Sequence, residues 1–346
     1  MIAFDEIFID KTKYGVKVQT SEYGEQGKHI IIDQGQTQIA GYTDREDGLF
    51  EEVPVVIFGD HTRVIKYVDE PFFLGADGVK VLRSKDNNAN YKYLYYALKN
   101  AKIPNTGYNR HFKWLKEVII KYPDRERQDE IVEILDKVSD VIQKRQDELS
   151  RLDNLIKARF VEMFGDPIIN SKNKDTQDLK DVLVLKAGDF TAASDISEEP
   201  TETNIYPCYG GNGIRGYVAD YNQEGEYSLV GRQGALSGNV QYAEGKFRNT
   251  EHALLVTPII EMNSIWLNQL LINLDLKRYQ TGAAQPGLSV KNLQEIPIIM
   301  VSIDEQNRYA DFVKQVDKSK FDTMTFAPIY AIINLYLHAH FYQGRR

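Results

Sequence analysis

The sequence predicts an α+β protein built from two similar globular domains with mixed β-sheet, joined by long spacer helices of the coiled-coil type. The first observation is an internal repeat: residues 115–128 (LKEVIIKYPDRERQ) align without a gap with residues 293–306 (LQEIPIIMVSIDEQ). Residues 39–42 (IAGY) likewise match 214–217 (IRGY), and the Thr-Gly pair at 106–107 recurs at 281–282. A period this long is too large for a solenoid and indicates two copies of one domain, each followed by a helix.

The second observation is the order of elements within each copy. In the first copy, residues 1–112, the runs 29–32 and 53–58 are typical of strands and residues 91–100 of a short helix. In the second copy, residues 179–291, the runs 227–230 and 253–257 predict strands and residues 264–276 a helix. Gly-rich turns separate the strands, and the GGNG run at 210–213 predicts a hairpin turn.

The third observation is a long helix predicted over residues 125–164, within a first spacer region at 113–178. Asp124 precedes it as a candidate cap, and the Gly165-Asp-Pro sequence ends it. Such a helix is about 60 Å long. Its apolar residues alternate at steps of four and three, as in a coiled-coil seam that packs against another helix or a partner subunit; they are Ile131, Leu135, Val138, Ile142, Leu149, Leu152 and Ile156.

The second copy begins an equivalent helix region at residues 292–321. Tyr309, Val313 and Val316 occupy the positions of the first three seam residues, but Lys320 then stands where Ile142 stood. Pro328 falls inside the expected helix, where proline costs about 3 kcal/mol. We therefore expect residues 322–346 to be a divergent C-terminal tail.

Composition limits the class of protein. The chain has 346 residues, 42% of them apolar and 27% charged, which is ordinary for a globular protein of about two domains. One cysteine, Cys208, and a start without a signal-peptide pattern favour the cytoplasm. The most apolar stretch, 326–342, is interrupted by polar residues and falls short of a membrane span. The net charge of −8 argues against a generic nucleic-acid binder, which would be basic.

Candidate binding residues lie on turns beside predicted strands. Arg232 and Gln233 follow a strand on a Gly-flanked turn, and these side chains can bridge guanine and adenine edges in the major groove; a plain polar turn is the alternative. The first copy places His61, Thr62 and Arg63 at the equivalent point. The different side chains indicate that the two copies read different sequences.

Further candidates are less specific. Arg215, Tyr217 and Tyr42 are candidates for contacts with phosphates or bases, and core packing is the alternative for the two tyrosines. Lys246 and Arg248 are phosphate-contact candidates or solvated surface residues. Asn109, Arg110 and Gln285 follow the two Thr-Gly loops, which either touch nucleic acid or simply connect a helix to a strand.

The sequence contains no catalytic motif that we would assign. It lacks the Gly-x4-Gly-Lys-Ser/Thr loop of ATP-driven enzymes. Residues 211–216 (GNGIRG) have Gly-x-Gly-x-x-Gly spacing, but we expect this Gly-rich run to form a hairpin turn rather than a dinucleotide site. His338 and His340 have no carboxylate or cysteine partner nearby in the sequence, so we expect no metal site.

Together these motifs identify a resemblance. Residues 206–217 (YPCYGGNGIRGY), 229–235 (LVGRQGA), 281–289 (TGAAQPGLS) and the two helix starts 126–128 (ERQ) and 304–306 (DEQ) are similar to the specificity (S) subunits of type I restriction-modification enzymes. The resemblance covers residues 1 to about 321. It implies two target-recognition domains that each read half of a split double-stranded DNA site, and spacer helices that dock two methyltransferase (M) subunits and the restriction (R) subunit.

The resemblance also implies that the chain is a non-catalytic DNA-binding subunit. It would bind no cofactor itself, with S-adenosylmethionine and ATP/Mg²⁺ held by the partner subunits. The shortened second helix departs from the family pattern and puts the second M-subunit contact in question. An interaction scaffold without DNA contact, favoured by the acidic balance, and an enzyme with an unfamiliar site are the alternatives.

Overall fold

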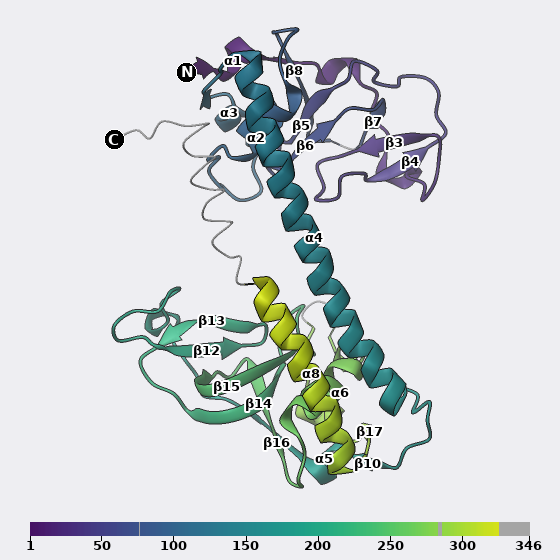
Figure 1. Ribbon diagram of the computed structural model, residues 1–346, viewed down its shortest axis with the longest axis vertical. Coiled ribbons are helices and arrows are strands. Elements are labelled where there is room, and N and C mark those ends of the chain that lie inside the picture. The colour runs from purple at the N-terminus through teal and green to yellow at the C-terminus, as the bar shows by residue number, and fades with distance from the viewer. Residues whose placement is uncertain (76, 283–285, 325–346) are drawn as a thin grey trace. The chain divides into compact units, whose positions relative to one another are not determined.

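The computed structural model describes residues 1–75, 77–282 and 286–324, with the backbone alone for residues 321–324. The described chain divides into two compact units, Met1–Arg145 and Gln146–Met324 (Figure 1). The long helix α4 (Arg125–Phe164) contributes its first part to unit 1 and its last part to unit 2.

Unit 1 is an α+β fold of short strands and few helices. In chain order its elements are β1 (Ile2–Ala3), α1 (Phe4–Ile7), β2 (Phe8–Asp10), β3 (His29–Ile32), β4 (Gly41–Thr43), β5 (Val55–Gly59), β6 (Ile65–Val68), β7 (Phe72–Leu74), β8 (Val79–Ser84), α2 (Tyr91–Lys99), α3 (Phe112–Leu115), β9 (Ile119–Ile120) and the start of α4; short 3-10 turns lie at Thr12–Tyr14 and Thr20–Glu22. The strands predicted at 29–32 and 53–58 and the helix predicted at 91–100 are confirmed as β3, β5 and α2.

Unit 2 repeats this order with longer strands. Its elements are the end of α4, β10 (Thr176–Asp178), α5 (Leu179–Val182), β11 (Leu183–Ala187), β12 (Tyr206–Gly210), β13 (Gly213–Val218), β14 (Gln223–Gly231), β15 (Val240–Asn249), β16 (Ala253–Pro258), α6 (Ser264–Asn273), α7 (Val290–Gln294), β17 (Pro297–Ile299) and α8 (Ile303–Met324), with 3-10 turns at Ala193–Asp195 and Leu276–Tyr279. The predicted strands lie within β14 and β16, and the GGNG hairpin turn joins β12 to β13. The helix predicted to reach residue 276 ends at Asn273, because Asp275 adopts a left-handed φ of 49°.

The sequence repeat corresponds to a structural repeat. The strand order β2-β8-β5-β6 of unit 1 matches β11-β16-β14-β15 of unit 2, so β5 and β14 hold the same inner position. The two-stranded pairs β1-β9 and β10-β17 also correspond. In both units the segment after the last of these strands leads into the long helix that follows the domain.

One difference between the units has a local cause. In unit 2 the ten-residue strand β15 pairs with β14 and, at its end, with β12, which gives one six-stranded sheet. In unit 1 the equivalent segment is divided into β6 and β7 by residues 69–71, which end in Pro71. Proline has no N–H to give to a ladder. Unit 1 therefore has a four-stranded sheet and a separate three-stranded sheet, β4-β3-β7.

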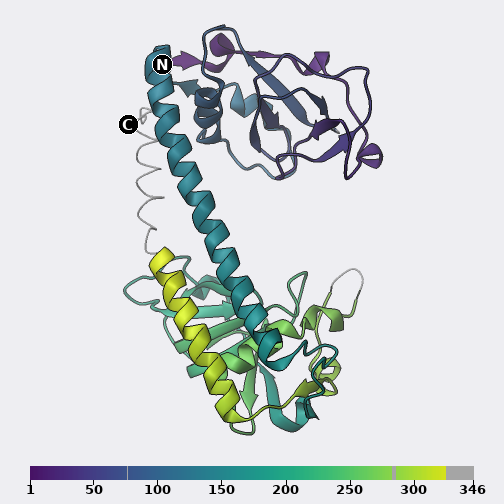
Figure 2. The same cartoon turned by 45° about the vertical axis from the view of Figure 1, so that its right-hand side comes forward.

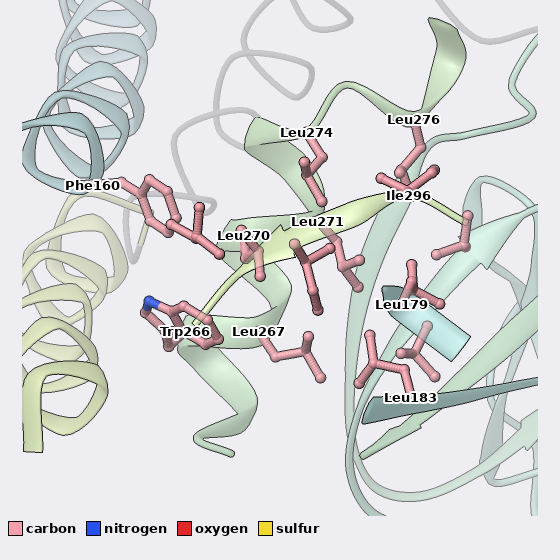
Figure 3. Packing of buried hydrophobic residues seen from close by; sticks show 14 of the residues in the cluster. Phe160, Leu179, Leu183, Trp266, Leu267, Leu270, Leu271, Leu274, Leu276 and Ile296 are labelled. Carbon is pink, nitrogen blue, oxygen red and sulfur yellow. The ribbon is translucent and has the colours of Figure 1, made fainter. Parts of the chain in front are cut away.

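Unit 2 has its largest core between α6, the sheet and the two long helices. Trp266, Leu267, Leu270 and Leu271 of α6 are buried there together with Phe160 of α4 (Figure 3). Phe164 of α4 and Tyr309 of α8 belong to the same core, with their ring centroids 5.5 Å apart.

Within unit 2, α8 and the end of α4 form an antiparallel pair (Figures 1 and 2). The hydroxyl of Tyr309 donates to the carbonyl of Ile156 at 3.1 Å. Further along α8, Lys320 Nζ lies 2.7 Å from Asp153 Oδ1, toward the N-terminus of α4. The predicted seam residues Tyr309, Val313 and Val316 are all buried. The described helix α8 extends past Phe321 to Met324, and Pro328 lies outside the described residues.

The apolar stripe of α4 is shared between two cores. Ile131 and Leu135 are buried in the core of unit 1 beside α2, whereas Ile156 is buried in the core of unit 2. These three side chains are thus used by the chain's own domains. The remaining members of the stripe are partly buried; they are Val138, Ile142, Leu149 and Leu152.

The repeated helix starts hold each long helix to its own domain. The side chain of Gln128, in the first turn of α4, accepts a hydrogen bond from the backbone N–H of Asn90 at 2.9 Å and donates to the carbonyl of Pro123 at 2.9 Å. Asn90 is the N-cap of α2. The same glutamine therefore joins the start of one helix to the start of another.

Gln306 repeats this arrangement in unit 2. Its side chain accepts from the backbone N–H of Asn263 at 2.9 Å, donates to the carbonyl of Val301 at 3.0 Å, and Asn263 is the N-cap of α6. Gln128 and Gln306 are each only 2% exposed. The glutamine of the acid-Gln repeat is thus a buried residue that links the start of each long helix to its own domain, rather than part of a surface motif. We call this arrangement the latch.

Replacing Gln306 with leucine is expected to lower the free energy of unfolding of unit 2 by about 2 kcal/mol or more. The change leaves the N–H of Asn263 and the C=O of Val301, both on half-buried residues, without their partner. Urea denaturation of the full chain, followed by circular dichroism, measures the loss. Gln315→Leu, at an exposed glutamine of the same helix, is the control, and an equal loss in both variants would rule out the latch.

Candidate nucleic-acid interface

In unit 1 the turn after the inner strand β5 is fastened to the Thr-Gly loop at residues 105–111. The carbonyl of Asp60 accepts from the backbone N–H of His111 at 2.8 Å, and the His111 ring Nδ1 lies 3.0 Å from the same oxygen. The Asp60 carboxylate accepts from the N–H of Phe112 at 2.7 Å. Because both Asp60 and His111 are buried, this joint fixes the two loops against each other.

The joint brings together candidates that are about 50 residues apart in the chain. The rings of His61 and Tyr108 stack with centroids 4.8 Å apart and an angle of 10° between their planes. Tyr108 is 89% exposed, and Asn109 and Arg110 beside it are also exposed. Asn109 donates from its side chain to the carbonyl of Thr106, which stiffens the loop. His61 thus supports one face of the Tyr108 ring and leaves the other face to solvent.

Unit 2 fastens the equivalent turn to the equivalent loop. The carbonyl of Arg232 accepts from the N–H of Leu288 at 2.8 Å, and Gly234 donates to the carbonyl of Pro286 at 2.9 Å. The backbones of Thr281 and Gly287 exchange two hydrogen bonds of 2.9 Å. Both units therefore place a turn after the inner strand against a Thr-Gly loop. We call each such pair the loop edge of its unit.

The side chains on the loop edge of unit 2 differ in whether other residues hold them in place. Gln233 Oε1 lies 3.0 Å from His252 Nδ1, so the amide is held in place. The guanidinium of Arg232 has no hydrogen-bond or ion-pair partner within the described part of the chain. Gln285, the third candidate, lies outside the described residues.

A tight backbone contact brings the β12–β13 hairpin to the same edge. A Cβ on Gly231 would lie 2.3 Å from the carbonyl oxygen of Gly211, so residue 231 must be glycine where these backbones meet. Asn239 donates to Asn212 at 2.9 Å across this contact. Arg215 is exposed on β13, and Tyr217, half-buried, pairs with Pro207. Arg215 thus projects from the hairpin whose tip adjoins the loop edge.

Lys246 and Arg248 lie elsewhere on unit 2. On the β14–β15 ladder Lys246 faces Glu224, roughly 25 Å along the strand from the Arg232 turn. Its Nζ lies 4.8 Å from the centre of the Tyr221 ring, and a hydrogen bond to that hydroxyl raises the Lys246 pKa. Arg248 is paired with Asp220 at 2.9 Å. The structure does not bring these two residues to the loop edge.

In unit 1 Tyr42 and Arg63 are also placed apart from the stacked rings. Tyr42 lies in the small sheet, half-buried, and its backbone exchanges hydrogen bonds with Gly24 at 2.8 and 2.9 Å. Arg63 follows His61 and Thr62 but has a left-handed φ of 62°, and its guanidinium donates to the carbonyl of Ile103 at 3.3 Å. Arg63 therefore points along the domain toward α2 and its following loop.

Sequence reasoning missed Tyr108, although its neighbours were candidates. Its place directly after Gly107, in a run of polar residues, was a signal for an exposed aromatic side chain. Within the described residues no group of three or more His, Cys, Asp or Glu side chains is placed to hold a metal ion. Nor does any helix in that part of the chain have the length and apolarity required to cross a membrane.

The chain matches one protein-family model over most of its length. The model described as Type I restriction modification DNA specificity domain matches residues 9–151 and 171–329. The chain belongs to this family. Each match includes one loop edge, and the two matches together contain most of the chain. The resemblance noted from the sequence motifs is therefore confirmed, and a DNA specificity family is consistent with paired, differently equipped loop edges.

Members with curated names are similar to the chain over different lengths. The Type I restriction enzyme EcoprrI specificity subunit of Escherichia coli is 38% identical over 202 residues, which are 57% of this chain but only 49% of that protein. This match thus spans about half of the relative's length. A putative type I specificity subunit of Mycoplasma genitalium is 22% identical over 332 residues, 90% of this chain and 85% of that protein.

A solved structure shares the fold. The crystal structure of the type I restriction-modification system S subunit from M. genitalium matches with a TM-score of 0.62 and 19% identity, covering 99% of this chain and 96% of that one. The predicted α+β class, with two similar domains and long helices, is confirmed by this match and by the structural repeat.

Proposed function

We propose that this chain is the DNA specificity subunit of a type I restriction-modification system. It reads a bipartite double-stranded DNA site, one half with each loop edge, and catalyses no reaction itself. One observation carries the proposal: both units join the turn after their inner strand to a Thr-Gly loop through an equivalent backbone bond, His111 N–H to Asp60 C=O and Leu288 N–H to Arg232 C=O, but equip this edge with different side chains. A shared frame with different side chains is what two half-sites of different sequence require.

The remaining roles follow the family. Residues 1–112 and 179–291 are the target-recognition domains, and residues 113–178 and 292–321 are the spacer regions. The surface of α4 that docks the partner subunits consists of the stripe residues that the domains leave partly exposed, namely Val138, Ile142, Leu149 and Leu152. The partners are two M subunits and the R subunit in the cytoplasm, and those subunits hold S-adenosylmethionine, ATP and Mg²⁺.

The candidate residues that lie on a loop edge are those expected to contact DNA. His61, Thr62, Asn109 and Arg110 with Tyr108 form the contact of unit 1, and Arg232, Gln233 and Arg215 form that of unit 2. Tyr217 and Tyr42 are half-buried in strands, and Lys246 and Arg248 lie away from the edge, so they have at most a supporting role.

The test is methylation by the assembled complex. The chain is co-expressed with its M subunit, and S-adenosylmethionine-dependent methylation is mapped across plasmid DNA by single-molecule sequencing. A split motif with a fixed gap is the expected result. A single continuous motif, or a soluble complex that methylates nothing, would contradict the proposal, and the second outcome would favour the acidic chain as a scaffold.

Tyr108→Ala is expected to weaken duplex binding by unit 1 without unfolding it. The exposed ring offers apolar surface to base edges and sugars in a groove of the duplex, and its loss is expected to cost about 1–2 kcal/mol, which corresponds to roughly fivefold to 30-fold in affinity. Fluorescence anisotropy of the complex on its own methylation site measures the change. Tyr14→Ala removes another exposed tyrosine of unit 1 and should leave affinity unchanged; a similar loss in both variants would remove Tyr108 from the interface.

A further inference from the structure

A cationic pocket opens beside the loop edge of unit 1. It has a volume of about 540 Å³ and lies between the edge strand β6, the β3–β4 connection and the end of α2. Its polar lining consists of Gln36, Gln38, Thr62, Arg63, Lys66 and Lys99. Three of these side chains are cationic, and none of the described residues that line the pocket carries a carboxylate. In a chain with a net charge of −8, this is a local reversal of sign.

The least expected member of the pocket is Lys66. Its side chain is only 2% exposed, and burial lowers its pKa while the Asp33 carboxylate opposes that shift. Its Nζ lies 3.4 Å from Asp33 Oδ1, longer than the usual 2.7–2.9 Å of a charge-assisted bond. Asp33 is its one hydrogen-bond partner among the residues that the structure describes. An ammonium with three donors is therefore buried with a weak partner.

The other donor side chains of the pocket are held in place by contacts that leave some of their N–H groups available. Lys99 Nζ donates to the Tyr95 hydroxyl at 2.8 Å and lies 5.2 Å from the centre of that ring, which holds the ammonium at the rim. Arg63 gives one of its five N–H groups to Ile103. Gln38 donates to the edge carbonyl of Tyr67 at 2.7 Å. These contacts hold several N–H donors around the pocket, and the described lining residues place no negatively charged acceptor opposite them.

We propose that this pocket binds a phosphate group. A phosphate has several acceptor oxygens and a charge opposite to that of Arg63, Lys66 and Lys99, and it would give buried Lys66 a second, closer partner beside Asp33. The pocket shares Thr62 and Arg63 with the loop edge, so the source that fits is a backbone phosphate of the DNA read there; this choice of source rests on the proposed function. Free phosphate presents the same chemistry and is the second source to be tested.

The experiment uses the full chain in complex with its M subunit. In one arm, duplex affinity is measured by fluorescence anisotropy over a range of salt concentrations. Lys99→Gln and Arg63→Asn each remove one cation, and asparagine tolerates the left-handed backbone at residue 63. Each lost phosphate contact reduces the slope of log K against log salt by about 0.9. Lys99→Arg keeps the charge and should keep the slope, as should Lys157→Gln, which removes an exposed charge from the unit 2 part of α4.

In the other arm, calorimetry with inorganic phosphate alone measures binding to the same variants, and thermal melts check their fold. A reduced salt slope in Lys99→Gln and Arg63→Asn supports the DNA backbone as the source. An unchanged slope with phosphate binding at least tenfold weaker supports free phosphate instead. If both the salt slope and phosphate binding are unchanged in these variants, the proposal that the pocket binds phosphate is wrong. Because the phosphate arm needs no sequence-specific DNA, it separates failure of the pocket from failure of the proposed function.

Discussion

Alanine at both Arg232 and Gln233 is expected to abolish recognition of one half of the split site. Each bidentate contact with a base contributes about 1–3 kcal/mol of discrimination, so losing both reduces specific methylation between roughly 30-fold and 25,000-fold. The turn itself should survive, because it is held by backbone bonds from Arg232 N–H to His252 and from Leu288 to Arg232. Single-molecule sequencing after co-expression with the M subunit measures the loss.

Lys246→Ala is the matched control for this double variant. It removes a cation from the same hairpin, at its far end, and should leave the motif unchanged. The half of the motif read by unit 1 should also stay defined in any residual methylation by the double variant. If the double variant methylates the full motif at the normal rate, the Arg232 turn is an ordinary polar turn and the DNA contact of unit 2 lies elsewhere.

Phe164→Ala is expected to have the largest effect on stability, about 3–5 kcal/mol. The Phe164 ring is fully buried where α4, α6 and α8 meet, with centroid distances of 5.1 Å to Phe160, 5.5 Å to Tyr309 and 6.1 Å to Trp266. Removing it leaves a cavity among three aromatic rings that cannot all close in. Urea denaturation of the full chain, monitored by tryptophan fluorescence, measures the change.

Val161→Ala tests whether this loss comes from the core. Val161 lies on the same helix but is 38% exposed, so its truncation should cost less than about 1 kcal/mol. If Phe164→Ala and Val161→Ala unfold at the same urea concentration, the aromatic junction contributes little and the α4–α8 pairing depends on other contacts.

The fold was largely predictable because its signals are local or repeated. Apolar runs such as 29–32 and 253–257 have the length of strands, and the acidic start and Gly165 stop define α4. The internal repeat then fixed the number of domains. The stripe on α4 was less informative, because apolar spacing does not tell whether Ile131 and Leu135 pack on their own domain or on a partner, and the structure buries both within unit 1.

The candidate site was predictable only in part. His61 and Arg110 were found separately from their residue types, but their shared edge depends on the buried joint between Asp60 and His111, which pairs residues 51 positions apart. Lys246 was a candidate because of its charge alone, and hairpin register decides that it lies far from Arg232. The role of Gln128 was also hidden, since a glutamine at a helix start is usually exposed.

The division of β6 from β7 at Pro71 gives the two recognition domains different mechanical properties. In unit 2 the Arg232 turn, the β12–β13 hairpin and the far edge strand β11 belong to one continuous hydrogen-bonded ladder, so a displacement at the turn is carried along the backbone. In unit 1 the small sheet β4-β3-β7 meets the larger sheet through packed side chains such as Ile32, Leu74 and Val81. There, the same displacement passes from one sheet to the other only through contacts between apolar side chains. Such contacts allow small sliding movements more easily than the backbone hydrogen bonds of a continuous sheet do.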